Sequence, residues 1–368
     1  MKRIIVFLIV LSLFCVQANA ETLYEQALDK AGFEKVEQSI DKDAKKLLEN
    51  YGIDPYNTDW IGELTAGNLF TVIIDFLKSG VGSMGSALGA NIAVLLLWAV
   101  FGTFANDLKT ANGAVNIAFT AILTLSVTVP VLKLITSVSA AIKAGGVFML
   151  SFVPLFCGIT AATGGITTAA GSSALLLTAA EVTVQIIAFV IIPVASAVLA
   201  LAIAGAFSEV SPAMRLSLAL KKAIGYVMTL TFTVFLGLLS VQTAISTAAD
   251  SVSLKTVKFM VGSFVPVAGS ALSETISTLG SSVKILQSGV GVYGIFAVLF
   301  TVLPVAAELV LWRFAFFIGK TAGDMLGVGE GTKIISAVDA TVALLLGTLL
   351  FVGALFIIAL AVVLKVSV

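Results

Sequence analysis

Long stretches without a charged residue recur along the chain. They cover 79–106, 110–132, 144–180, 182–208, 223–249, 285–307 and 340–364. Each exceeds the roughly 18–20 residues that cross the hydrocarbon core of a bilayer as a helix. Helices of a soluble protein would show a polar face, which these runs lack. The pattern therefore predicts an all-α polytopic membrane protein with about six spanning helices, near 88–106, 113–132, 183–207, 223–247, 291–317 and 337–364.

Composition supports this class and removes several kinds of chemistry. Hydrophobic residues make up 59% of the chain, charged residues 11%, and the mean hydropathy is +1.10. The chain has no histidine, which excludes Ser-His-Asp catalysis, HExxH zinc sites and histidine proton relays. Two cysteines are too few for a cysteine metal cluster. We therefore expect no catalytic residue, no metal, no other cofactor and no nucleic-acid partner.

Residues 1–20 have the features of a secretory signal peptide. Lys2 and Arg3 precede an apolar stretch, residues 4–16, and Ala18-Asn19-Ala20 forms a small-residue cleavage site. The apolar stretch is short for a spanning helix, and the alternative is an uncleaved anchor. Cleavage would leave Cys157 as the single cysteine, so the mature chain would form no internal disulfide.

The segment 21–63 carries eleven acidic and five basic residues. Its apolar residues recur at helical spacing up to Gly52 and the Asp54-Pro55 step, which should end the helix. We expect an acidic helical segment outside the cytoplasm, either a solvated amphipathic helix or a contact surface for a partner. Residues 64–119 should hold an interfacial segment, 64–87, followed by the first membrane helix.

Signal cleavage would place the mature N-terminus outside and fix the topology. The connections 107–112, 208–222 and 318–336 then face the cytoplasm, and the C-terminus lies outside. Lysine and arginine are evenly divided between the two sides, so the positive-inside rule adds nothing to this orientation.

An internal duplication is visible in matched positions. Ser-Phe-Val-Pro occurs at 151–154 and again at 263–266, and Pro193 and Pro304 each lie in an F-x3-P-V-A string. We interpret residues 120–230 and 231–342 as two repeats, with 343–368 as the remainder of the last helix and a tail. Because each repeat would contribute an even number of crossings, the repeats should point the same way.

The two Ser-Phe-Val-Pro segments, 146–170 and 259–282, are rich in glycine, serine and threonine. Proline removes a backbone donor and glycine loosens a helix, so we expect broken or re-entrant helical hairpins there. The alternative is a seam of small residues at which helices pack closely. The prolines and serines of the duplicated strings are candidate functional positions: Ser151, Pro154, Pro193, Ser263, Pro266 and Pro304.

Among the ionisable residues, Glu308 is the strongest candidate for a functional role, because it lies deep in the fifth predicted helix. A carboxylate in hydrocarbon is costly, so Glu308 should be neutral, paired or facing water. We expect it to serve a function or a subunit contact. Arg313 is a poor partner on the same helix, and its side chain should reach toward the membrane edge.

The string VGSFVPVAGSALSE, residues 261–274, together with the signal peptide, the acidic segment and the hydropathy layout, resembles the stage III sporulation protein AE family. The resemblance implies a non-enzymatic multispanning subunit of a channel complex that connects mother cell and forespore and is needed for late forespore development. It places the protein in the outer forespore membrane, with the mature N-terminus in the intermembrane space. Partners implied by the resemblance are a cytoplasmic ATPase, small membrane subunits and a ring-forming protein. A homo-oligomer is a further option that the sequence leaves open.

Two other functions remain open from the residues alone. One is a stand-alone secondary transporter that uses Glu308 as a coupling carboxylate and the Ser-Phe-Val-Pro hairpins as gates. The other is a membrane-embedded enzyme, which the missing histidines disfavour.

Overall fold

The computed structural model describes residues 28, 32–56, 60, 66–107, 112–162, 166–206, 212–264 and 269–367. All regular structure within these residues is helical. The predicted signal peptide lies outside the described residues. The elements are α2 (Phe33–Ser39), α3 (Lys42–Asn50), α5 (Ala66–Asp107), α6 (Asn112–Ala162), α7 (Ile166–Ile186), η1 (Ile187–Ile191), α8 (Ile192–Ala206), α9 (Pro212–Phe264), α10 (Gly269–Met325) and α11 (Gly329–Ser367).

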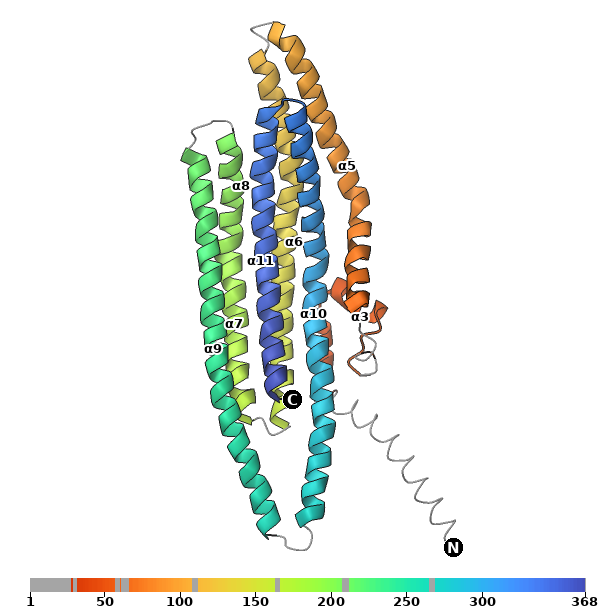
Figure 1. Ribbon diagram of the computed structural model, residues 1–368, viewed down its shortest axis with the longest axis vertical. Coiled ribbons are helices and arrows are strands. Elements are labelled where there is room, and N and C mark those ends of the chain that lie inside the picture. The colour runs from red at the N-terminus through yellow and green to blue at the C-terminus, as the bar shows by residue number, and fades with distance from the viewer. Residues whose placement is uncertain are drawn as a thin grey trace, which may run out of the picture.

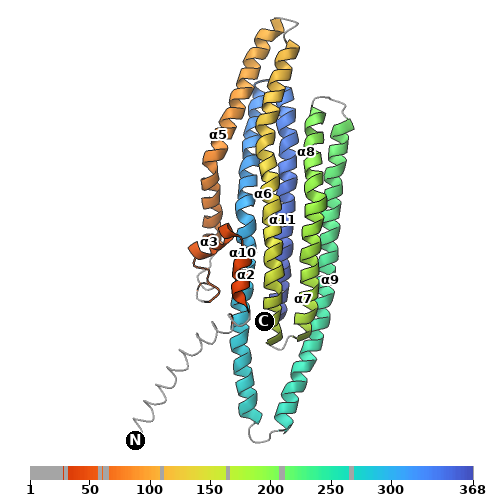
Figure 2. The same ribbon diagram turned by 180° about the vertical axis from the view of Figure 1, so that it is seen from behind.

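The long helices form an elongated bundle in which the spanning segments that follow one another in the chain run in opposite directions (Figures 1 and 2). Helix α11 packs most extensively on α10 and also contacts α6 and α8. We call the end that carries α2 and α3 the acidic end. The opposite end, where α5, α8 and α10 end and α6, α9 and α11 begin, is the turn end (Figure 1).

Six helical stretches in the described residues are long and apolar enough to cross a membrane. Each contains or overlaps one predicted helix, so the predicted number and order of spans are confirmed. The helix ends on either side of the three connections predicted to share one face also lie together at the turn end (Figure 1). The stretches are Met84–Phe104, Gly113–Ala161, Ala169–Gly205, Pro212–Ile245, Gln287–Met325 and Gly329–Leu364.

The helices are longer than the prediction. Helix α10 has 57 residues, about 85 Å at ~1.5 Å per residue, against a hydrocarbon core of about 30 Å. The α5–α6 hairpin extends past the other helices at the turn end, and the α9–α10 hairpin extends past them at the acidic end (Figure 2). Most of the predicted interfacial segment 64–87 belongs to α5, which is continuous from Ala66, and its place at the interface stays a prediction. The predicted loops 208–222 and 318–336 were too long, because helices extend into them.

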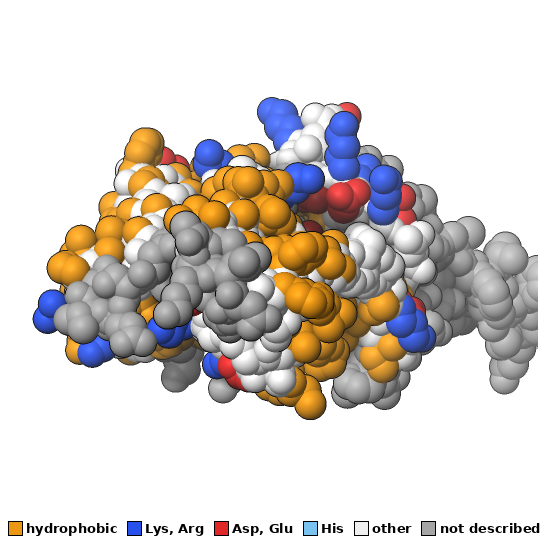
Figure 3. All heavy atoms as spheres, turned by 90° about the horizontal axis from the view of Figure 1, so that it is seen from above, with side chains coloured by type: hydrophobic (Ala, Val, Ile, Leu, Met, Phe, Trp, Pro, Cys, Tyr) orange, Lys and Arg blue, Asp and Glu red, His pale blue; other side chains and the backbone are white. Residues whose placement is uncertain are grey.

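Exposed apolar side chains cover the protruding α5–α6 hairpin. Seen from the turn end, hydrophobic side chains cover much of the visible surface, while charged ones lie mainly around its margin (Figure 3). Such a surface is normal for helices that contact lipid or other membrane subunits. The hairpin contributes Leu97, Phe101, Phe104, Ile117 and Leu125, all about half exposed or more.

The first Ser-Phe-Val-Pro segment, 146–170, contains the end of α6 at Ala162 and the start of α7 at Ile166. Helix α6 continues through Ser151 and Pro154, so the helix does not break at this proline, and a re-entrant hairpin stays a prediction. Proline in a helix removes one hydrogen bond, but the flanking Phe152 and Phe156 are fully buried against neighbouring helices. Their packing offsets the lost bond.

The second segment lies at the tip of the α9–α10 hairpin. Helix α9 ends at Phe264 and α10 begins at Gly269, so Ser263 is in the last turn of α9, while Pro266 lies outside the described residues. The two copies of the motif therefore occupy different positions relative to a chain reversal. Helices α6 and α9 do run in the same direction, as parallel repeats would, and the duplication stays a prediction.

The helix that contains Pro193 shows a local irregularity. A π-helical turn, η1, joins α7 to α8 and ends two residues before Pro193. Proline cannot donate to the carbonyl four residues earlier, here Phe189, which lies inside this turn. The proline accounts for the widened turn, and its own ring lies on the exposed side of α8.

Candidate functional site at the acidic end

Over residues 32–56, the described core of the acidic segment, the chain forms two short helices, α2 and α3, rather than the single helix predicted. They are separated at Ile40 and Asp41, and the Asp41 carboxylate accepts hydrogen bonds from the backbone N–H groups of Asp43 and Ala44, at 3.0 and 3.4 Å. This capping begins α3. The predicted end at Gly52 is confirmed, because that glycine follows α3 with a left-handed φ of 66°.

The apolar face of this segment packs on the chain's own membrane helices. Phe33 is fully buried, and its ring lies edge-on to Tyr293 of α10, with centroids 5.5 Å apart. Trp60 meets Phe296, and Tyr51 meets Phe300, one and two turns further along α10. Because α10 covers the apolar face, this face is neither solvated nor free for a partner.

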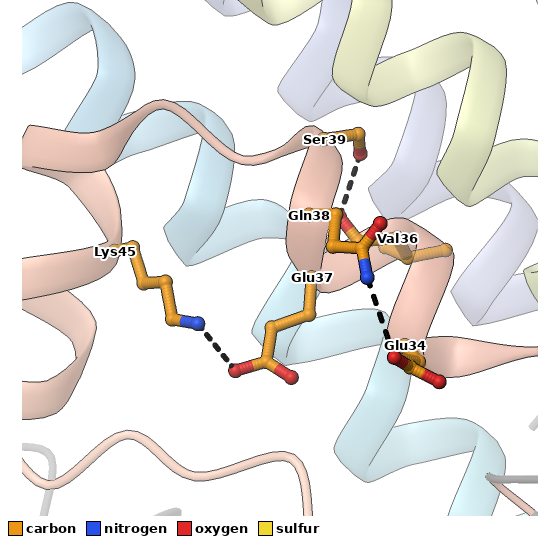
Figure 4. A network of polar contacts seen from close by, with 6 residues as sticks. All are labelled: Glu34, Val36, Glu37, Gln38, Ser39 and Lys45. Carbon is orange, nitrogen blue, oxygen red and sulfur yellow. Dashed lines mark hydrogen bonds and ion pairs between the residues drawn. The ribbon is translucent and has the colours of Figure 1, made fainter.

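The polar face of the segment carries a small network of contacts (Figure 4). The Lys45 ammonium lies 2.8 Å from the Glu37 carboxylate and joins α3 to α2. The amide of Gln38 donates to Glu34 at 3.3 Å. Hydrogen bonding to Glu37 raises the pKa of Lys45 above its ordinary 10.5. The Lys45 charge therefore contributes throughout the neutral range, and its contribution is lost as pH rises through the folded-state pKa.

Beside this segment, α6 presents a ladder of three buried aromatic rings to α10. Phe148 and Phe152 stack with centroids 5.1 Å apart, and Phe152 and Phe156 at 5.6 Å. Glycines of α10 make room for the rings. A Cβ on Gly294 would collide with the Phe152 ring, and one on Gly291 would lie 3.0 Å from Phe156. The glycines that make room for the rings, Gly291 and Gly294, lie outside both Ser-Phe-Val-Pro segments, so a seam of small residues within those segments stays a prediction.

Ser151 and Pro154 lie on the other face of α6, at the junction with the acidic segment. They border an open groove of about 560 Å³ whose opposite wall comes from Gly32, Lys35 and Val36. Ser151 and Pro154 are thus the predicted site residues that line a groove shared with α2.

Sequence reasoning missed a buried polar contact nearby. The Gln287 amide of α10 donates to the Thr160 hydroxyl of α6 at 2.8 Å, and both residues have no exposed surface. The Gln287 carbonyl oxygen has no partner among the described residues. A lone glutamine in the charge-free run 285–307 was the available signal, but its partner is 127 residues away.

Glu308 lies elsewhere, on the exposed side of α10. The indole of Trp312, one turn on, donates a hydrogen bond to its carboxylate. Glu308 is fourteen residues beyond Gly294, or roughly 21 Å along the helix axis. Pro304 lies one turn before Glu308, and Pro193 is exposed on α8. The structure therefore does not gather the predicted residues into one site.

Arg313 has a partner on another helix. Its Nε donates to the Asp339 carboxylate of α11 at 3.0 Å, with both side chains partly exposed. The prediction that Arg313 reaches toward the membrane edge did not include this ion pair, which links α10 to α11. No group of three or more potential metal-ligating side chains occurs among the described residues.

Comparison with known proteins identifies relatives of the chain. The chain is 24% identical over 216 residues to stage III sporulation protein AE of Bacillus subtilis (strain 168), a match that covers 59% of this chain. It covers 54% of the relative, so the chain spans about half the length of the curated relative it matches. No solved structure matches. The family profile of stage III sporulation protein AE matches residues 58–367, which include all six candidate spans. The chain therefore belongs to the stage III sporulation protein AE family.

Proposed function

We propose that this chain is a non-enzymatic, multispanning subunit of a sporulation channel or export complex that connects mother cell and forespore and is required for late forespore development. The observation that carries the proposal is the family match over 58–367, which coincides with the six candidate spans. The proposal assigns the chain no catalytic residue and no cofactor.

The fold supports a role as a scaffold for other membrane subunits. Both long hairpins project beyond the bundle, and the α5–α6 hairpin exposes apolar side chains along its length (Figure 1). Helices that face neighbouring subunits need this kind of surface. The partners in this proposal are a cytoplasmic ATPase, small membrane subunits, a ring-forming protein and further copies of the chain.

The proposed location is the outer forespore membrane. Signal-peptide cleavage would place the acidic end in the space between the two membranes, and the turn end in the mother-cell cytoplasm. The ATPase would then meet the turn end, and the ring-forming protein the acidic end.

Deletion of the gene tests the assignment. We expect the deletion strain to arrest after engulfment, with a shrinking forespore and a late forespore-specific reporter at least tenfold dimmer than in the parent. The measurement is fluorescence imaging through sporulation. Expression of the intact chain from a second locus is the control and should restore the signal. Normal spore formation in the deletion strain would refute the proposal.

Replacement of Glu308 by glutamine separates the scaffold from the transporter. We expect Glu308→Gln to complement the deletion within about twofold of wild type, because its amide oxygen can still accept from Trp312. Heat-resistant spore counts give the measurement. Glu330→Gln, on the exposed start of α11, removes the same charge and serves as the control. Loss of spores with Glu308→Gln alone would favour a coupling carboxylate and the transporter.

A further inference from the structure

A cleft opens between the acidic segment and α10. It has a volume of about 650 Å³, and α2, α3, the turn after α3 and α10 contribute to its walls. We call it the acidic cleft and define it by Glu37, Glu49, Asp54, Tyr56, Trp60 and Tyr293. Tyr293 is near the start of the candidate span Gln287–Met325, so the cleft lies at one end of the span rather than at its middle.

The cleft carries uncompensated negative charge. Three carboxylates line it, and the single ammonium among its lining residues, that of Lys45, is paired with Glu37. Asp54 uses one oxygen to accept from the backbone N–H of Tyr56 at 2.9 Å, which leaves its second oxygen available. Glu49 is exposed, and its carboxylate makes no hydrogen bond or ion pair within the described part of the chain.

Tyr293 supplies an independent sign of a ligand. Its side chain is only 3% exposed, yet it lines the cleft. Packing against Phe33 fixes the ring. The hydroxyl makes no hydrogen bond among the described residues and is not enclosed by protein atoms, so it is open to a group that enters the cleft. A hydroxyl held at the wall of an acidic cleft can accept from an N–H donor that enters it.

Aromatic rings complete the wall. The Trp60 indole donates to the Asp54 carbonyl at 2.7 Å, and its ring lies edge-on to Phe296, so the ring is held in place before any ligand arrives. Tyr56 packs edge-on to Phe33. Carboxylates beside aromatic faces suit a guanidinium or ammonium group, which combines ionic, hydrogen-bonding and cation–π contacts.

We propose that the acidic cleft binds an arginine or lysine side chain presented by a polypeptide segment of a partner protein. Carboxylates on two sides, an unpaired tyrosine hydroxyl and fixed rings match a cation that carries several N–H donors. This inference rests on the proposed function, because it assumes that the chain assembles with another protein at its acidic end. The inference adds the location of the contact with the partner protein and the chemical groups that form it.

Photocrosslinking in sporulating cells tests the proposal. Tyr56 is replaced by the photoreactive amino acid benzoylphenylalanine in the full chain, cells are irradiated after engulfment, and the crosslinked peptide is identified by mass spectrometry. We expect a peptide from another protein that contains arginine or lysine next to the crosslinked residue. The double variant Glu49→Gln with Asp54→Asn keeps hydrogen-bonding groups but removes the charge, and should lower the crosslink yield at least tenfold.

Two further variants test whether the crosslink depends on groups inside the cleft. Tyr293→Phe removes only the hydroxyl and should lower the yield about threefold or more. Glu34→Gln removes one charge from the same segment outside the cleft and should leave the yield within twofold, with every variant compared at equal protein level. Crosslinks only to lipid or to the chain itself, or a yield insensitive to the cleft charges, would overturn the inference. Failure of the proposed function looks different, because the deletion strain would then form normal spores.

Discussion

Replacing Gly294 by leucine should disrupt the contact between α6 and α10 and lower the stability of the whole bundle. The glycine faces the Phe152 ring so closely that even a Cβ atom would collide with it. Phe152 is fully buried between rings of the same ladder and cannot move aside without displacing Phe148 or Phe156. Overpacking of this kind costs about 1–3 kcal/mol. We expect the midpoint of thermal unfolding in detergent to fall by roughly 2–10 °C.

Gly225 offers a matched control for this substitution. It lies on the exposed side of α9, and a Cβ built on it would meet no atom within 4 Å. Gly225→Leu makes the same chemical change in another long helix and should leave the unfolding midpoint within about 1 °C. Equal midpoints for the Gly294 and Gly225 variants would mean that the aromatic ladder is not tightly packed against α10.

The number of membrane helices could be predicted because hydropathy depends on composition alone. Their lengths could not, because a helix that leaves the membrane gains charged residues and no longer looks apolar. Helix α9 continues through Lys221 and Lys222, and α5 through Asp75 and Lys78, so both were assigned to loops or to an interface. Backbone hydrogen bonding within each helix continues regardless of such a change in solvent.

The effect of Pro154 shows a second limit. From the sequence, a proline followed by a glycine-rich stretch favours a break, since one hydrogen bond is lost. The packing of Phe152 and Phe156 on Gly294 and Gly291 decides otherwise, and those glycines are about 140 residues away. A local pattern therefore identified the motif but could not identify what it contacts.

The candidate site at the acidic end was only partly visible in the sequence. The helical spacing of apolar residues in 21–63 indicated a face that something must cover. Nothing in the sequence distinguished the stretch of α10 that covers it from other apolar helices. The acidic cleft depends on this docking, because Tyr293 enters it from α10 and the carboxylates from the acidic segment.

Replacing Phe33 by alanine should release the acidic segment from the membrane helices. Phe33 has no exposed surface and packs edge-on to both Tyr56 and Tyr293. Removing a fully buried phenylalanine costs roughly 3–5 kcal/mol. Because each ~1.4 kcal/mol is a factor of ten, the fraction of molecules with the segment undocked should rise about 100-fold or more. Trypsin cleavage of the full chain in detergent at Lys35, Lys42, Lys45 and Lys46 measures this fraction when docking is fast relative to cleavage.

The control for this prediction is a second aromatic residue of the same segment. Tyr51 contacts Phe300 but is 37% exposed, so Tyr51→Ala removes less buried surface and should accelerate cleavage by clearly less than Phe33→Ala. Cleavage within the α5–α11 bundle should not change in either variant, because the bundle keeps its own core. If Phe33→Ala left the lysines as protected as in the wild type, contacts other than this ring would hold the segment. The acidic cleft would then keep its shape without Phe33, and contacts other than the Phe33 ring would hold Tyr293 in place.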